Sequence, residues 1–291
     1  MDLSRYLEPK FWLLAIAAAL VALHLTLLSH ADDTELFATS VLFWVAAGSL
    51  LWDKYQTVTL QSGVISSAIG SLMLILLGLR VASSPDSSSS GWAFPLVAAI
   101  GLGLLASSAK GLRQYWKELT IFGLLAIYPF LELTLQSIDL SEITAKAATL
   151  ILGYLGLEVQ RQGVFLNILG HGATVSSRVQ VYGACSGIHN MLQMLNISVL
   201  FLLMFPVRSH LQKMLCVGVA IAIGFVINSI RVALMAILNN AGDKYAFDYW
   251  HEGTGSLMFS AIAVLLFGCF CWFAFLRQPT QKPDSGAEGN A

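Results

Sequence analysis

Three residues in the second half of the chain have the side chains that acyl transfer requires: Cys185, Arg231 and His251. A thiolate is a nucleophile, a guanidinium stabilises negative charge developing on an oxygen, and an imidazole accepts or delivers a proton near neutral pH. Cys185 falls in the stretch VYGACSGIHNMLQMLN, residues 181–196, where an apolar segment begins. The positive end of a helix starting there is expected to lower the pKa of the thiol. Together, these residues predict a cysteine acyl-transfer site.

A second histidine competes for the proton-transfer role. His189 lies one helical turn after Cys185 and begins a polar stripe that continues through Gln193 and Asn196. Spacing alone leaves the choice between His189 and His251 open. We expect His189 to orient the reacting groups or to contact the substrate.

Other polar residues are candidates to position these groups. Asn228 and Arg231 share one face of the next apolar segment, so this polar edge and the His189 edge are expected to meet inside a helix bundle. The remaining candidates flank the cysteine and the histidine: Tyr182, Asn190 and Glu252.

The composition is that of a membrane protein. Hydrophobic residues make up 56% of the chain and charged residues only 11%, with a mean hydropathy of +0.72, which leaves too little polar surface for a soluble globule. The net charge of -1 and the lack of a long basic tract argue against a nucleic-acid partner. The four cysteines form no CxxC pair and no Cys/His metal spacing, so neither a metal nor an organic cofactor is expected.

The apolar segments predict an all-α polytopic membrane protein. A transmembrane helix needs roughly 17–25 mainly apolar residues, and the first segment is too long for a signal-peptide core. About eight segments meet the requirement: 11–29, 36–52, 59–82, 92–109, 118–136, 187–206, 213–239 and 254–276.

A polar insertion separates the fifth and sixth segments. Its most apolar part, 147–157, is too short to cross a membrane and predicts an amphipathic helix at the interface. The stretches GVFLNIL and TVSSRVQVY alternate in the manner of a small β-hairpin. The expected organisation is therefore a five-helix membrane region, an extracytoplasmic insertion, a catalytic three-helix region and a cytoplasmic tail, at 1–136, 137–183, 184–276 and 277–291.

The positive-inside rule predicts the orientation. Placing both termini in the cytoplasm puts most Lys and Arg residues on that side and the insertion outside. Cys185 and His251 then lie at the outer ends of their spans, and Arg231 lies about two turns inward. The three reactive side chains are expected to share the outer face of a plasma or inner membrane.

Three short motifs carry a resemblance. The chain reads ACSG around Cys185, NSIR from Asn228 to Arg231, and WHEGTG around His251. In this order, at predicted helix ends over roughly residues 140–275, they resemble the exosortase/archaeosortase family of integral-membrane transpeptidases. The resemblance implies cleavage of a C-terminal sorting signal of the PEP-CTERM type through a Cys185 thioester, with His251 as the base. It also implies membrane-anchored substrates with a tripartite tail and transfer to an amine or other acceptor.

Other functions remain open at this stage. A transporter would line a polar pathway with residues such as Arg231, His189 and Gln193, but it predicts polar residues throughout the membrane depth and an internal repeat. A non-enzymatic envelope-export factor is a third possibility. Ser186 is an alternative nucleophile, as in intramembrane serine proteases, although the neighbouring thiol of Cys185 is favoured.

Overall fold

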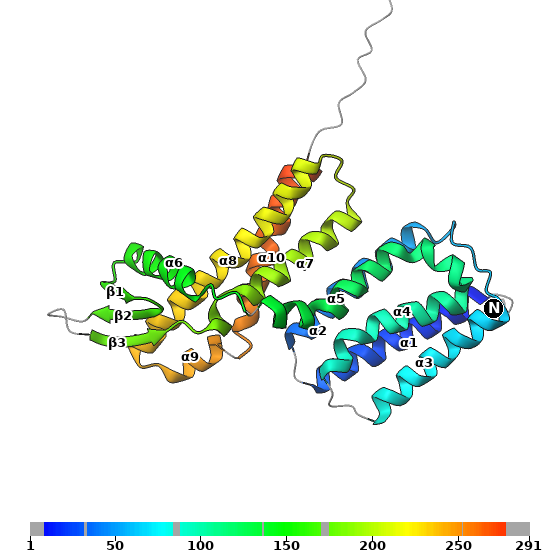
Figure 1. Cartoon of the computed structure of the whole chain (residues 1–291), viewed down its shortest axis with the longest axis horizontal. Coiled ribbons are helices and arrows are strands. Elements are labelled where there is room, and N and C mark those ends of the chain that lie inside the picture. The colour runs from blue at the N-terminus through cyan, green and yellow to red at the C-terminus, as the bar shows by residue number, and fades with distance from the viewer. Residues whose placement is uncertain are drawn as a thin grey trace, which may run out of the picture.

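The computed structural model describes residues 9–31, 34–83, 88–135, 137–169, 175–251 and 253–277. Its helices form two groups that lie side by side (Figure 1). Helices α1 to α5 form the N-terminal group. Helices α7, α8 and α10 form the C-terminal group, which also carries a small sheet and helix α6.

The N-terminal group consists of long apolar helices. Within lipid, a helix satisfies all its backbone polar groups internally, which is why such segments fold this way. A core cluster that includes Phe43, Phe122 and Leu125 joins this group to Leu200 of α7. The helices are α1 (Pro9–His30), α2 (Thr34–Asp53), α3 (Val64–Ser83), α4 (Ser88–Gly111) and α5 (Trp116–Leu135), with a short 3-10 turn at Leu112–Tyr115 before α5.

The C-terminal group is built around a close contact between α7 (Ile188–Met204) and α8 (His210–Ala241). A Cβ atom placed on Gly224 of α8 would lie 2.8 Å from the backbone oxygen of Asn190 in α7. Only glycine allows backbones to approach this closely. Helix α10 (Ser256–Cys271) packs against both through a cluster that includes Phe259 and Phe267.

The all-α polytopic prediction is confirmed. Among the described residues, six segments are long and apolar enough to cross a membrane. One of them, Gly91–Leu135, runs through both α4, which is kinked at Ser108, and α5; the 3-10 turn Leu112–Tyr115 lies between the two helices. Helix α7 is a shorter apolar helix of 17 residues. These helices correspond to the eight segments predicted from the sequence.

The insertion contains more structure than predicted. Helix α6 spans Ser141–Tyr154 and so begins before the predicted position. A three-stranded antiparallel sheet replaces the predicted two-stranded hairpin, in the order β1 (Val159–Gln162), β2 (Phe165–Leu169) and β3 (Val175–Gln180). The predicted β2–β3 pair is present, and its turn lies outside the described residues. Strand β1 could not be predicted from its sequence, VQRQ. Its side chains alternate between half-buried and exposed positions, but apolar and polar residues do not alternate along it.

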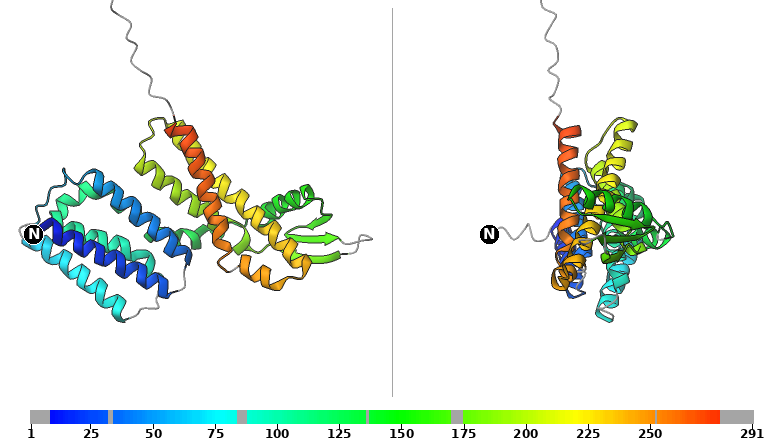
Figure 2. Two further views of the ribbon diagram at one scale, coloured as in Figure 1. Left: turned by 180° about the vertical axis from the view of Figure 1, so that it is seen from behind. Right: turned by 90° about the vertical axis from the view of Figure 1, so that its left-hand side faces the viewer.

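The insertion is packed onto the end of α8. One stripe of α6, including Ala145, Ala148 and Leu152, is buried against Leu166 of β2 and Val232 of α8. Figure 2 shows α6, the sheet and α9 gathered at the same end of α8, with α10 running alongside it. The insertion therefore packs against the part of α8 that follows Arg231.

An additional helix, α9 (Lys244–His251), lies between α8 and α10 and was not predicted. Helix α8 ends at Ala241 and is followed by Gly242, which has the left-handed φ of 70° common just after helix ends. The side chain of Asp243 then accepts a hydrogen bond of 2.9 Å from the backbone N–H of Ala246, which caps α9. His251 consequently ends a short helix and does not open the last span directly.

Candidate functional site

The thiol of Cys185 and the imidazole of His251 face each other. The Sγ and Nε2 atoms are 3.9 Å apart, although 66 residues separate them in the chain. Cys185 ends the 3-10 turn η3 (Gly183–Cys185) that precedes α7, and His251 ends α9. Both residues are half-buried. A long contact of this kind suits a nucleophile and its base before substrate binds.

Arg231 of α8 completes the group. One guanidinium nitrogen, Nη2, donates a hydrogen bond of 2.5 Å to the backbone carbonyl of His251. This bond uses one of the five N–H donors that a guanidinium carries. The positive charge of Arg231 also acts on the thiol of Cys185. The structure therefore brings together the three residues selected from the sequence.

The expected lowering of the Cys185 pKa is wrong. Burial raises the pKa of this thiol above its usual value, and the charge of Arg231 offsets only part of the effect. The reason is local: α7 begins at Ile188, after Gly187 with a φ of 92°. Cys185 thus lies before the helix and outside its first turn, and it depends on a base for deprotonation.

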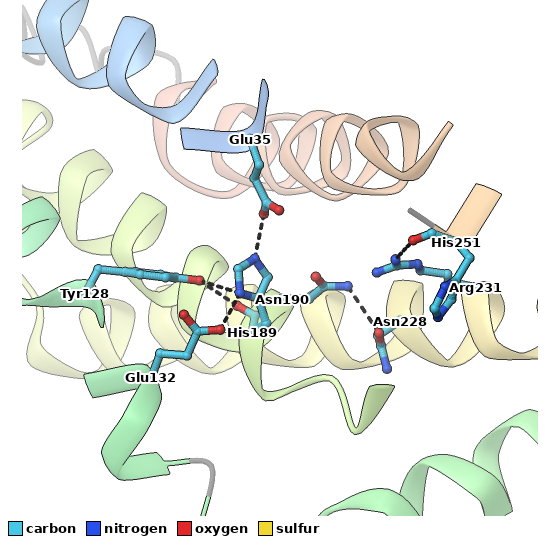
Figure 3. A network of polar contacts seen from close by, with 8 residues as sticks. All are labelled: Glu35, Tyr128, Glu132, His189, Asn190, Asn228, Arg231 and His251. Atoms are coloured by element: carbon cyan, nitrogen blue, oxygen red, sulfur yellow. Dashed lines mark hydrogen bonds and ion pairs between the residues drawn. The ribbon is translucent and has the colours of Figure 1, made fainter. Parts of the chain in front are cut away.

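Two asparagines, which Figure 3 shows bonded to each other, hold the turn that carries the thiol. The buried side chain of Asn228 donates a hydrogen bond of 2.9 Å to the carbonyl of Cys185. Asn190 of α7 in turn donates a bond of 3.3 Å to the side-chain oxygen of Asn228. A Cβ atom on Gly187 would lie 2.8 Å from the Asn228 amide nitrogen, so this position needs glycine for space as well as for φ.

The insertion also holds this turn. The hydroxyl of Thr144 in α6 donates a hydrogen bond of 2.7 Å to the carbonyl of Ser186. The backbone N–H groups of Cys185 and Ser186 donate to the carbonyls of Tyr182 and Gly183. Since these two amides are already bonded, Arg231 is the better placed donor for an oxyanion at the site.

The other candidates next to the motifs differ in their placement. Tyr182 is 61% exposed, and its carbonyl accepts a hydrogen bond from the backbone N–H of Cys185. Glu252 lies outside the described residues. The hydroxyl of Ser186 is buried and has no hydrogen-bond partner within the part of the chain described. Of the two neighbouring nucleophiles, the thiol of Cys185 and the hydroxyl of Ser186, the thiol is the one that faces an imidazole.

The stripe formed by His189 and Gln193 does not meet the edge formed by Asn228 and Arg231, so that expectation is wrong. It faces the N-terminal group instead, and Asn190 is the α7 residue that faces α8. The left-handed Gly187 separates Cys185 from the helical phase of α7, so the thiol and the imidazole of His189 do not share a helix face.

His189 belongs to a second polar cluster, to the left of the asparagines in Figure 3. Its Nδ1 and Nε2 atoms each lie 2.7 Å from a carboxylate oxygen, of Glu132 in α5 and Glu35 in α2 respectively. The hydroxyl of Tyr128 lies 3.1 Å from Nδ1. The sequence reading missed Glu35, Glu132 and Tyr128. The available signal was the presence of ionisable residues inside apolar helices, which are functional candidates by default.

The arrangement of thiol, imidazole and guanidinium supports nucleophilic chemistry. Within the described ranges, no group of three His, Cys, Asp or Glu side chains is placed to hold a metal ion. The thiol of Cys185 can pass its proton to His251, and Arg231 can stabilise negative charge beside them. A nucleophile, a base and a group that stabilises negative charge are the components that acyl transfer needs.

A comparison with protein families agrees with this geometry. The family model described as transmembrane exosortase matches residues 31–268. The match includes α2 to α5, whereas the motifs alone extended the resemblance only over roughly 140–275. None of the curated proteins or solved structures compared with the chain matches it. Because the family model covers most of the sequence, including every element that holds the thiol, imidazole and guanidinium, the chain belongs to the transmembrane exosortase family.

Proposed function

We propose that this protein is a membrane cysteine transpeptidase that cleaves a C-terminal sorting signal of the PEP-CTERM type. Family membership supports a general role in transpeptidation and in the sorting of membrane proteins. The observation that carries the more specific proposal is the 3.9 Å approach of Cys185 Sγ to His251 Nε2, beside the guanidinium that bonds the carbonyl of His251.

The reaction begins with proton transfer. Because burial raises the pKa of Cys185, its thiol is neutral in most enzyme molecules at pH 7. His251 takes the thiol proton as the sulfur attacks the scissile carbonyl of the substrate. Arg231 stabilises the oxyanion of the tetrahedral intermediate. The imidazolium of His251 then protonates the leaving amine, and the cleaved substrate protein remains bound to Cys185 as a thioester. An acceptor nucleophile resolves the thioester and restores the thiol.

The site lies on the extracytoplasmic side in this proposal. The apolar helices support a multi-pass membrane protein, and the positive-inside rule places both termini in the cytoplasm. The end of α8, the start of α7 and the insertion then lie outside. A sorting signal with its recognition motif just beyond a transmembrane helix would present its scissile bond at this depth. The substrates are membrane-anchored proteins with a tripartite tail, in the plasma or inner membrane.

The division into regions follows from this assignment. Residues 1–136 form the N-terminal membrane region, 137–183 the extracytoplasmic insertion, 184–276 the catalytic region and 277–291 the cytoplasmic tail. Among the positioning residues, Asn228 and Asn190 act on the turn of Cys185 through hydrogen bonds.

The test compares processing of a co-expressed protein carrying a PEP-CTERM-type tail by the wild type and by Cys185→Ala. We expect the substitution to abolish processing, and hydroxylamine to release the acyl group from the wild type. Cys269→Ala is the control, because Cys269 is a free and exposed cysteine away from the site. Processing that survives Cys185→Ala would overturn the cysteine mechanism. Cys185 kept as the only cysteine should also react with a membrane-impermeant thiol reagent from the outside.

A further inference from the structure

A separate cavity of about 230 Å³ is lined in part by His189, the residue that precedes Asn190 in α7. Residues of α2, α4, α5 and α7 line it, and Cys185, Arg231 and His251 are not among them. The side chains of Glu35, Glu132 and His189 at the cavity are between 26% and 37% exposed, so ligands can reach it. The proposed mechanism uses none of these three residues.

The cavity carries negative charge. Both ring nitrogens of His189 lie 2.7 Å from a carboxylate oxygen. A neutral imidazole has a proton on only one nitrogen, so two N–H···O bonds require the imidazolium. One imidazolium between the carboxylates of Glu35 and Glu132 leaves a net charge of about -1. The cavity therefore favours a cationic ligand.

Two buried amides lie deeper along α7. Gln193 is 8% exposed and Asn196 is 4% exposed, and both line the cavity. Neither side chain makes a hydrogen bond to another residue that the structure describes, and neither is among the residues whose buried polar atoms lack a partner. Their amide atoms are therefore accessible from the cavity, where they can bond a polar ligand or ordered water.

Aromatic rings complete the wall. Trp92 of α4 and Tyr128 of α5 stack with ring centroids 4.8 Å apart and planes at 2°. Aromatic faces attract organic cations. The cavity thus offers carboxylate oxygens, amide oxygens and aromatic surface, which together match the three N–H donors of an ammonium group.

We infer that this cavity binds a primary ammonium group, and that its ligand is the acyl acceptor of the transfer reaction. This inference rests on the proposed function. The two sites are linked through α7, because His189 lines the cavity and the next residue, Asn190, bonds Asn228, which in turn bonds the carbonyl of Cys185. The bound ammonium loses one proton to a carboxylate of the cavity. Its nitrogen then attacks the thioester carbonyl carbon, the C–S bond breaks, and His251 transfers the second proton from nitrogen to the sulfur of Cys185.

The first test measures binding without catalysis. We would titrate ethanolamine into the Cys185→Ala protein in nanodiscs of phosphatidylcholine and phosphatidylglycerol, following the ligand by NMR. We expect saturable binding that weakens about tenfold in Glu35→Gln or Glu132→Gln, and also weakens in Gln193→Leu. Thr134→Val is the control, because the Thr134 hydroxyl bonds the carbonyl of Phe130 in its own helix and does not line the cavity; it should bind normally, and tetramethylammonium, which has no N–H donor, should bind more weakly than ethanolamine. Equal binding by parent and glutamine variants would overturn the inference.

The second test measures transfer. With Cys185 intact, Glu35→Gln should still form the thioester, but the ratio of amide to hydrolysed product should fall about tenfold at fixed ethanolamine. An unchanged ratio would overturn the acceptor role. Vesicles containing phosphatidylethanolamine, compared with phosphatidylcholine vesicles, distinguish a lipid amine from a soluble one. Loss of ammonium binding contradicts only this inference, whereas processing by Cys185→Ala contradicts the proposed function and leaves the binding test valid.

Discussion

The side-chain amide of Asn228 donates a hydrogen bond of 2.9 Å to the backbone carbonyl of Cys185, so α8 holds the turn that carries the nucleophile. The same helix supplies Arg231, one turn further along. One helix therefore sets the position of the sulfur and of the positive charge beside it.

Replacing Asn228 with alanine should reduce turnover more than substrate binding. The carbonyl of Cys185 loses its buried partner, at a cost of about 1–3 kcal/mol, and the thiol loses its alignment with His251. We expect kcat to fall at least about tenfold with a smaller change in KM. Ser229→Ala is the control, because the Ser229 hydroxyl bonds only the carbonyl of Phe225 in its own helix. Equal losses in both variants would show that Asn228 has no positioning role.

The reactivity of Cys185 should depend on pH in a direction set by Arg231. Burial disfavours the thiolate and the guanidinium favours it. Removing the charge in Arg231→Met should raise the pKa further, so the midpoint for alkylation by iodoacetamide should move to higher pH. A midpoint that is unchanged or moves to lower pH would contradict the assigned charge effect. The measurement needs a background in which Cys216, Cys269 and Cys271 are replaced.

Arg231→Lys should separate charge from geometry. An ammonium keeps the positive charge but lacks the planar fork that contacts the His251 carbonyl and an oxyanion together. We expect an alkylation midpoint near that of the wild type with severely reduced processing. Near-normal processing would reduce Arg231 to an electrostatic role.

Gly187→Ala should damage both stability and activity. The backbone at φ 92° disfavours a Cβ atom, and that atom would lie 2.8 Å from the Asn228 amide. Strain of this type costs roughly 1–3 kcal/mol, visible as a lower thermal unfolding midpoint. Gly183→Ala, in the same turn but with nothing within 4 Å of its Cβ position, should behave as the wild type.

Lys54→Met should destabilise the N-terminal helices. Lys54 lies 2.8 Å from Glu118, whose side chain is only 4% exposed. Removing the cation leaves a buried carboxylate unpaired, which typically costs about 3–5 kcal/mol. The exposed Lys146–Glu142 pair provides the control, since Lys146→Met should leave the unfolding midpoint unchanged. A small effect of Lys54→Met would mean that water or lipid headgroups reach Glu118.

The sequence alone predicts the membrane class and the helices well, because apolar length is a strong local signal. It also selects Cys185, Arg231 and His251 as candidates, and the structure places them together. It fails where one residue changes the backbone direction. The left-handed Gly187 places Cys185 before α7 rather than at its start. For this reason the pKa of the thiol is raised instead of lowered, and the His189 stripe has other partners than predicted.

The second cluster was harder to foresee. Glu35, Glu132 and His189 come from three helices, and 154 residues separate Glu35 from His189. No local pattern links them, and the assembly appears only when α2, α5 and α7 pack together. The strand β1 was missed for a different reason, since its VQRQ sequence contains a single apolar residue and its pairing depends on β2.

The contact between Gly224 and Asn190 brings the backbones of α7 and α8 together with no side chains between them. Two helices joined in this way resist sliding and separation, so the sulfur and the guanidinium travel as one rigid body. Helix α9 is tied to the same body, because the guanidinium of Arg231 bonds the carbonyl of His251. The imidazole therefore already faces the thiol before a substrate arrives.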